Sequence, residues 1–281
     1  MRHVLIVTNR DKDQDLKLAT QIKTFFENHD GSAVILPDIY QTGIDQKILP
    51  ANLEAAIALG GDGTILQLSR GLRGLNLPIM GVNLGHLGFL AETEVGELDF
   101  MLDCLLRDQY RIEKRMMIAG QVVHEGNPIC ESMALNDIVI GRSGFSRIIS
   151  MDLFVNGQLI DNFQADGMII ATPTGSTAYS LSAGGPIINP IAELIEITPI
   201  CAHSMQSKSI ILDKNDKISV QIKSTRRTQL EEAHAVFDGQ KGILLSADDM
   251  VNVEKAEEQV KLIRIANQGF YHILKHKLDR F

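Results

Sequence analysis

The sequence is poor in cysteine, in long apolar runs and in clustered positive charge. Its three cysteines, Cys104, Cys130 and Cys201, lie far apart and form no Cys-x-x-Cys pair. This argues against a disulfide framework or a zinc site, and favours reduced thiols buried as small apolar side chains. No apolar stretch is long enough to cross a bilayer, so we expect no membrane association. The formal charge is −8 without a long basic run, which argues against nucleic acid as a partner.

Other signals are also missing. The residues from Met1 to Thr8 lack the longer apolar region and cleavage site of a signal peptide, so we expect a cytoplasmic protein. No Gly-x-Gly-x-x-Gly follows the first expected strand, and no Gly-x-x-x-x-Gly-Lys-Ser/Thr occurs anywhere. The usual dinucleotide fingerprint and the P-loop are therefore both excluded.

A glycine-rich turn around Asp62 organises the first half of the chain. The apolar run from Ala55 to Leu59 predicts a buried strand, and Gly60-Gly61-Asp62-Gly63-Thr64 follows it directly. We expect Thr64 to be the N-cap of the helix that begins next. Strand, glycine turn and helix start together predict a phosphate site, because backbone N–H groups there point at the ligand.

The acidic side chain of Asp62 is unexpected at a phosphate site, because a carboxylate repels phosphate. One explanation is a magnesium ion that the carboxylate shares with phosphate oxygens. Another is a general base that takes the proton of a hydroxyl attacking the phosphate. A tight turn in which Asp62 bonds its own backbone explains a lone Gly-Asp-Gly equally well.

The pattern of apolar residues predicts two domains. Up to about residue 109, strands at 3–8, 32–36, 55–59 and 77–82 alternate with helices at 15–29 and 97–106, which indicates a doubly wound α/β domain. From 110 to 266 short β-type runs predominate, with a hairpin turn at Asn156-Gly157, and predict a β-sandwich-like domain. We expect the tail, about 267–281, to pack back on the first domain. The active site is expected in the cleft between the two domains.

Two polar segments of the second half suggest a nucleotide site. The segment from Asp166 to Pro186 is rich in glycine and hydroxyls, with Tyr179 able to pack against a base. A hydroxyl-rich loop that caps a helix is the alternative. Asn136-Asp137 interrupts the apolar run from Met133 to Ile140, where the pair can grip two ribose hydroxyls or mark a bulge or strand end.

With these motifs in order, the chain resembles the bacterial NAD kinases nearly end to end. The resemblance includes Gly81-Val-Asn83-Leu-Gly85-His86-Leu-Gly88-Phe89, Pro199-Ile-Cys201-Ala202-His203-Ser204 and Phe237-Asp238-Gly239-Gln240. The Asp166 to Pro186 segment is the most specific part, since the Gly-Gly-Asp-Gly turn also occurs in diacylglycerol kinases and phosphofructokinases. Asp137 stands where many relatives carry glutamate.

The resemblance implies transfer of the ATP γ-phosphoryl group to the 2′-hydroxyl of the adenosine ribose of NAD, with a divalent metal such as Mg²⁺. It implies that Asp62 is the proton acceptor, that Gly63 contacts NAD and that Asn136 and Asp137 hold a ribose. It also implies a homodimer or homotetramer. The other implied dinucleotide contacts are Arg147, Gln164, Asp166, Thr177, Ala178, Tyr179, Ser180, Leu181, Ser182 and Gln240.

Two rival functions differ in class. A lipid or sugar kinase shares the glycine-aspartate turn, but a lipid kinase should present an apolar or basic membrane face, which the sequence does not indicate. A sensor that binds NAD(H) or NADPH without turnover gains nothing from a carboxylate beside phosphate. Asp62 therefore favours an enzyme.

Overall fold

The computed structural model describes residues 2–37, 44–85, 87–91, 93–143, 148–203, 208–223, 233–265 and 269–279. The chain forms two compact units, Met1–Lys114 with Val260–Phe281 and Arg115–Gln259. Strands β6 (Arg111–His124) and β17 (Met250–Arg264) contribute residues to both units. The functional domain boundaries expected near 109 and 267 stay a prediction.

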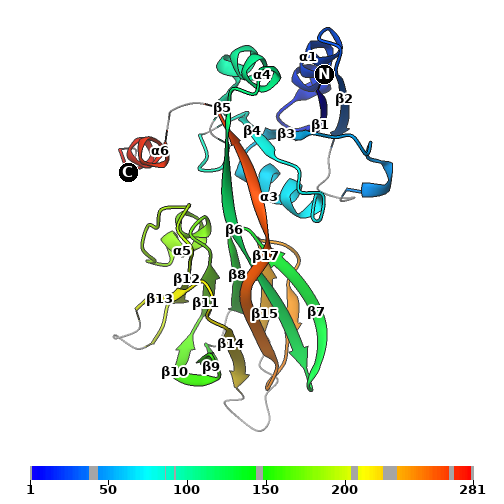
Figure 1. Cartoon of the computed structure of the whole chain (residues 1–281). Coiled ribbons are helices and arrows are strands. Elements are labelled where there is room, and N and C mark those ends of the chain that lie inside the picture. Colours follow the sequence, from blue (N-terminus) through cyan, green and yellow to red (C-terminus); the bar gives the residue numbers. More distant parts are fainter. Residues whose placement is uncertain are drawn as a thin grey trace. The chain divides into compact units, whose positions relative to one another are not determined.

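The first unit is built on a parallel sheet (Figure 1). Strand β1 (His3–Thr8) pairs with the edge strand β2 (Ser32–Pro37) on one side and with β3 (Ala55–Gly60) on the other. Next to β3 lies β4 (Ile79–Asn83), which also pairs with β5 (Thr93–Glu94) and, at Ile79, with Leu262 of β17. Every one of these pairings is parallel, so the strands all end at the same edge of the sheet.

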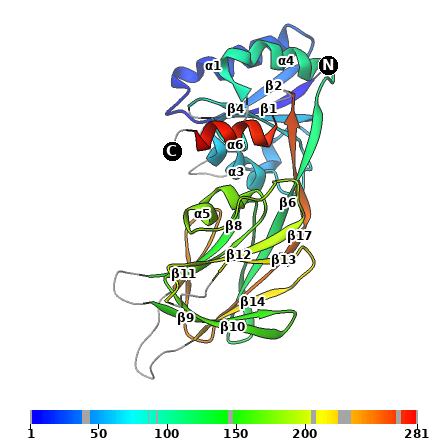
Figure 2. The same cartoon turned by 90° about the vertical axis from the view of Figure 1, so that its left-hand side faces the viewer.

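Helices cover both faces of this sheet. Side chains of α1 (Lys17–Glu27) and α4 (Leu98–Leu106) share an apolar core with Met80 and Val82 of β4. The Cα hydrogen of Gly81 that a side chain would replace faces the other side of the sheet from Met80 and Val82, because side-chain direction alternates along a strand. There a Cβ on Gly81 would lie 2.5 Å from Ile65 of α3 (Asp62–Gly71). Figures 1 and 2 show α1 and α4 on one side of the strands and α3 on the other. The predicted doubly wound α/β fold is confirmed.

The second unit is an antiparallel β-sandwich. In one layer β9 (Ile149–Val155) lies between β10 (Gln158–Ala165) and β14 (Ile218–Lys223), as Figure 2 shows, and β14 pairs with β17. The other layer has the order β13 (Ile210–Asp213), β12 (Leu194–Ile200), β11 (Gly167–Ala171), β8 (Asp137–Arg142), β15 (Ala233–Phe237) and β16 (Ile243–Leu245). Side chains of both layers share one apolar core. The expected β-rich second half is confirmed.

Local predictions in the second half had mixed outcomes. Asn156 and Gly157 form the predicted two-residue turn between β9 and β10, both with positive φ (52° and 78°). The run from Met133 to Ile140 is two strands rather than one, because β7 (Asn127–Ala134) ends before Asn136 and β8 starts at Asp137. The alternative of a strand end at Asn136-Asp137 is therefore the observed one.

All three cysteines were expected to be buried, and this was wrong for two of them. Cys104 is buried as expected, but Cys130 is half-buried and Cys201 is exposed. Helix α6 (Phe270–Leu278) belongs to the first unit, where the ring centroids of Phe270 and Phe89 lie 5.8 Å apart. No helix in the part of the chain that the structure describes is both long and apolar enough to span a bilayer.

Candidate active site

The glycine turn lies at the carboxyl end of β3, as the sequence predicts. The helix α3 begins at Asp62, three residues earlier than expected, with Gly61 as its N-cap. The prediction of Thr64 as the N-cap was wrong. Thr64 is instead the third residue of α3, and its Oγ1 is 3.5 Å from the amide nitrogen of Gly61. Asp62 therefore sits in the first turn of a helix, where the macrodipole favours negative charge.

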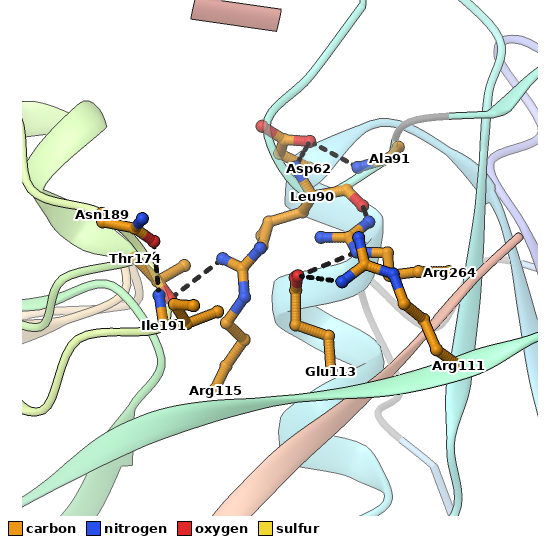
Figure 3. Close-up of polar contacts among 10 residues, drawn as sticks. All are labelled: Asp62, Leu90, Ala91, Arg111, Glu113, Arg115, Thr174, Asn189, Ile191 and Arg264. Carbon is orange, nitrogen blue, oxygen red and sulfur yellow. Dashed lines mark hydrogen bonds and ion pairs between the residues drawn. The ribbon is translucent and has the colours of Figure 1, made fainter. Parts of the chain in front are cut away.

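The Asp62 carboxylate accepts hydrogen bonds from three consecutive backbone N–H groups, and Figure 3 shows those from Leu90 and Ala91. Phe89 N–H donates to Oδ2 at 2.9 Å, while the N–H groups of Leu90 and Ala91 donate to Oδ1, both at 3.0 Å. None of the three earlier explanations anticipated this arrangement, because these donors belong to the second glycine turn. The bonds fix the carboxylate in one orientation, since charge-assisted hydrogen bonds are among the strongest in proteins.

Gly88 is required for this approach. A Cβ at position 88 would lie 1.9 Å from Asp62 Oδ1 and 2.6 Å from its Cγ, which is far inside van der Waals contact. Any other residue at 88 would have to displace the carboxylate or the turn. The glycine that the sequence shows before Phe89 is thus a steric condition for the position of Asp62.

A buried arginine holds the same turn from its other side. Arg264, only 4% exposed, donates from Nη1 to the carbonyl oxygen of Leu90 at 2.8 Å and from Nε to Glu113 Oε1 at 3.0 Å (Figure 3). The peptide that donates to Asp62 therefore also accepts from Arg264. Glu113 balances the buried guanidinium, so three side chains lock one turn.

The first turn of α3 offers unused backbone donors. Within the described ranges, the N–H groups of Asp62 and Gly63 have no acceptor, as is usual for the first residues of a helix. A side chain on Gly63 would meet open space, so the protein itself does not require glycine there. A glycine at an exposed helix start lets a ligand approach the backbone closely.

The second unit contains a matching aspartate that the sequence analysis missed. Asp238 also accepts from three consecutive N–H groups: Leu135 at 2.9 Å, Asn136 at 2.8 Å and Asp137 at 3.2 Å. In return, Asp238 N–H donates to the carbonyl oxygen of Asp137 at 3.0 Å. Asp238 thereby fixes the Asn136-Asp137 turn. Its position before Gly239, just after a strand, was the available signal.

The Asp137 side chain is 5% exposed and bonds to none of the described residues. Burial, and then the nearby Asp238 carboxylate, raise the pKa of Asp137 to about 7. A buried carboxyl group without a protein partner is costly, so a site of this kind suits a ligand that brings hydroxyl donors.

Many hydroxyls of the predicted nucleotide segment point inward. Thr174 accepts from the buried Arg115 at 3.2 Å (Figure 3), and Ser176 Oγ donates to the carbonyl oxygen of Pro173 at 2.8 Å. Ser180 donates to Glu196 Oε1 at 2.9 Å, and burial raises the pKa of this glutamate. These contacts support the capping-loop alternative for part of the segment, because they build its interior.

Other residues of the segment face outward. Tyr179 is 47% exposed and Leu181 37%, both in the short helix α5 (Tyr179–Ser182). Ser182 is exposed, and Thr177 and Ala178 are half-buried. The structure therefore offers five of the six predicted side chains from 177 to 182 to a ligand, while the Ser180 hydroxyl is committed to the interior.

The remaining predicted contacts belong to the second unit. Gln164 and Gln240 are exposed. Asp166 is half-buried and forms an ion pair with Arg142, with 3.1 Å between Oδ1 and Nε. Arg147 lies outside the described residues.

The chain matches two protein-family models and is similar over nearly its whole length to curated NAD kinases. Residues 38–110 match the model of the ATP-NAD kinase N-terminal domain, and residues 135–265 match that of the ATP-NAD kinase C-terminal domain. An NAD kinase of Lachnoclostridium phytofermentans is 45% identical over 281 residues, which cover 99% of both chains. An NAD kinase of Thermoanaerobacter sp. is 41% identical over 285 residues, again covering 99% of both.

Solved structures share the fold at lower identity. A yeast NADH kinase complexed with NADH superimposes with a TM-score of 0.86 at 24% identity, covering 99% of this chain and 88% of that one. An NAD kinase from Archaeoglobus fulgidus in complex with ATP gives a TM-score of 0.79 at 23% identity and covers both chains fully.

Because Arg264 bonds to both Leu90 and Glu113, we expect that shortening its side chain lowers the free energy of unfolding considerably. Arg264→Met leaves Glu113 without its buried partner, and breaking such a pair costs about 3–5 kcal/mol. Urea unfolding of the purified protein measures the change. The matched control is Arg107→Met, whose surface pair with Asp103 should contribute less than about 1 kcal/mol. If the two substitutions changed the free energy of unfolding equally, the stabilising role of Arg264 would be contradicted.

The raised pKa of Asp137 predicts that the free energy of unfolding falls as pH rises toward neutrality. A folded-state pKa raised to about 7 means that the folded protein binds this proton more tightly than the unfolded chain, so its contribution to stability is lost as pH rises from about 4 through about 7. Asp137→Asn removes this loss. The variant should gain about 2–3 kcal/mol relative to the wild type between pH 5 and pH 8, measured by denaturant unfolding. Parallel pH curves for the two proteins would refute the raised pKa.

Proposed function

Because the chain belongs to the ATP-NAD kinase family, we propose that it transfers the γ-phosphoryl group of ATP to the 2′-hydroxyl of the adenosine ribose of NAD, forming NADP. The single observation that carries this proposal is the Asp62 carboxylate, held by three N–H groups beside the open N-terminus of α3. The related yeast and Archaeoglobus fulgidus proteins bind NADH and ATP, which are ligands of the two classes required.

Asp62 is the proposed proton acceptor. A carboxylate has about four lone-pair positions. Two positions on Oδ1 and one on Oδ2 are filled by the described backbone donors, which leaves one on Oδ2. A ribose hydroxyl that donates to this position is oriented. It loses its proton to Asp62 as its oxygen attacks the γ-phosphorus, and the bond from that phosphorus to the bridging oxygen breaks with ADP as the leaving group. Catalysis of this kind is mainly positioning plus general-base assistance.

The residues of the second unit are proposed to bind the dinucleotide. Asn136 and Asp137, fixed by Asp238, hold a ribose through its hydroxyls. Asp137 suits this role because it is buried and no described residue occupies its side chain. The exposed ring of Tyr179 packs against a base. The other proposed contacts are Gly63, Arg147, Gln164, Asp166, Thr177, Ala178, Ser180, Leu181, Ser182 and Gln240.

A divalent metal is proposed to arrive with ATP. Among the residues with described positions, no group of three or more His, Cys, Asp or Glu side chains could hold an ion. We therefore propose that Mg²⁺ is held largely by the phosphates of the substrate rather than by a cage of protein side chains. When bound, the ion would offset negative charge on the phosphate oxygens.

The remaining proposals derive from the family resemblance. We infer a cytoplasmic enzyme that forms a homodimer or homotetramer, with an N-terminal α/β domain completed by the tail and a C-terminal dinucleotide-binding domain. The sensor alternative is disfavoured because the fixed orientation and open lone pair of Asp62 serve proton transfer and do nothing for binding alone.

Turnover tests the proposal directly. Purified protein incubated with ATP, Mg²⁺ and NAD should form NADP. Asp62→Asn should lower kcat by about 10²- to 10⁴-fold, because an amide cannot accept the proton. Its affinity for NAD, measured by calorimetry, should stay close to that of the wild type.

Asp238→Asn controls for the structural part of the Asp62 effect, since it also disrupts a triple backbone acceptor. This variant should raise the KM for NAD and keep most of kcat. Assays are run well below the melting temperature of each protein. Near-normal kcat in Asp62→Asn at saturating substrates would exclude Asp62 as the base.

Gly88 gives an independent test of the position of Asp62. Gly88→Ala places a methyl group where Asp62 Oδ1 now lies, so the carboxylate must move by an ångström or more. A displacement of this size costs about 10²-fold in rate, which initial-rate measurements will detect. Gly96→Ala is the matched control because a Cβ there meets no atom within 4 Å. Full activity of Gly88→Ala would show that the position of Asp62 is not critical.

A further inference from the structure

Three parallel strands end together beside the glycine turn. Asn9, after β1, donates from its N–H to the carbonyl oxygen of Leu59 at 3.0 Å, which ties the loop after β1 to the end of β3. Leu84, after β4, donates to the carbonyl oxygen of Gly60 at 2.7 Å. The loops after β1, β3 and β4 therefore meet at one edge of the sheet, and ligands of doubly wound sheets bind at this edge.

The ammonium group of Lys12 lies over two of these loops. A Cβ built on Gly61 would be 3.8 Å from Lys12 Nζ, and one built on Gly85 would be 3.3 Å from the same atom. At each glycine, Nζ is the single described atom within 4 Å of that position, apart from atoms of the glycine and its two chain neighbours. Lys12 thus bridges the turn after β3 and the turn after β4.

The main chain at Lys12 is fixed, although its side chain is free. Lys12 N–H donates to the carbonyl oxygen of Asn9 at 3.0 Å. The next residue, Asp13, is 2% exposed and accepts from Thr8 Oγ1 at 3.0 Å and from the N–H of Leu18 at 2.9 Å. By contrast, the Lys12 ammonium forms no hydrogen bond or ion pair with any residue that the structure describes. A rigid loop therefore presents a cation that is paired with none of the described residues.

Donors without acceptors accumulate at the same strand ends. Asn83 is 4% exposed; its Oδ1 accepts from the N–H of Gly85 at 3.0 Å, but its Nδ2 has no acceptor among the described residues. The N–H groups of Asp62 and Gly63 likewise have no acceptor in the described part of the chain. An unpaired buried donor is unfavourable, so this concentration of donors around one free cation indicates an anionic ligand.

We infer that Lys12 binds the phosphate chain of the nucleoside triphosphate donor. This inference rests on the kinase reaction proposed above and adds the cation that this reaction needs. Asp62 repels the phosphates by its negative charge, and Lys12 supplies an opposite charge from a neighbouring loop. Lysine serves as a point charge for phosphate in other nucleotide sites. Lys12 lies before residue 38, where the match to the N-terminal family model starts.

Steady-state kinetics of the full chain test this role. Lys12→Met removes the charge and keeps an unbranched side chain, so the KM for ATP should rise at least about tenfold while the KM for NAD changes less than about twofold. Lys12→Arg keeps the charge and should restore most of the ATP affinity. Lys17→Met, a substitution of an exposed lysine at the start of α1, should leave both KM values unchanged.

A binding measurement separates this inference from the proposed function. ATP and inorganic triphosphate, without metal, should raise the melting temperature of the wild type, and Lys12→Met should abolish the rise. If the wild type forms no NADP, the kinase proposal fails and this shift alone decides the role of Lys12. An unchanged KM for ATP with an unchanged shift, or a rise in the KM for NAD instead, would overturn the inference.

Discussion

A carboxylate that accepts three consecutive backbone N–H groups is the interaction on which both halves of this protein depend. In the first unit Asp62 binds the turn from Phe89 to Ala91, and in the second unit Asp238 binds the turn from Leu135 to Asp137. Each aspartate holds a connection between elements through three hydrogen bonds. The residues proposed to act on the sugar hydroxyl and to hold the sugar are Asp62 itself and the residues that Asp238 holds.

The two aspartates differ in what supports them. The turn held by Asp62 is gripped again by Arg264, whose guanidinium is balanced by Glu113 deep in the first unit. Asp238 instead lies near another carboxyl group and contributes to the raised pKa of Asp137. The first arrangement favours rigidity around a charged base. The second keeps a buried acid poised between charge states near neutral pH, at a cost in stability.

Local patterns in the sequence predict the elements well and their long-range contacts poorly. The parallel strands and the glycine turn at Asp62 follow from apolar runs and glycines that are close in the chain. The partners of Asp62 lie 27 to 29 residues away and those of Asp238 lie 101 to 103 residues away, and no local pattern specifies such pairs. For the same reason, the composition of the hydroxyl-rich segment does not reveal that the Thr174 hydroxyl faces inward, because its partner Arg115 lies 59 residues away.

The central claim is that a fixed Asp62 receives a proton from a ribose hydroxyl. The most direct test is a crystal structure of the full chain with NAD and a non-hydrolysable ATP analogue. The account predicts that Asp62 Oδ2 lies about 2.6–3.2 Å from the 2′-hydroxyl oxygen of the adenosine ribose. It also predicts that the three backbone bonds to the carboxylate persist. An Asp62 carboxylate that bonds only to the backbone, remote from the bound ribose, would contradict it.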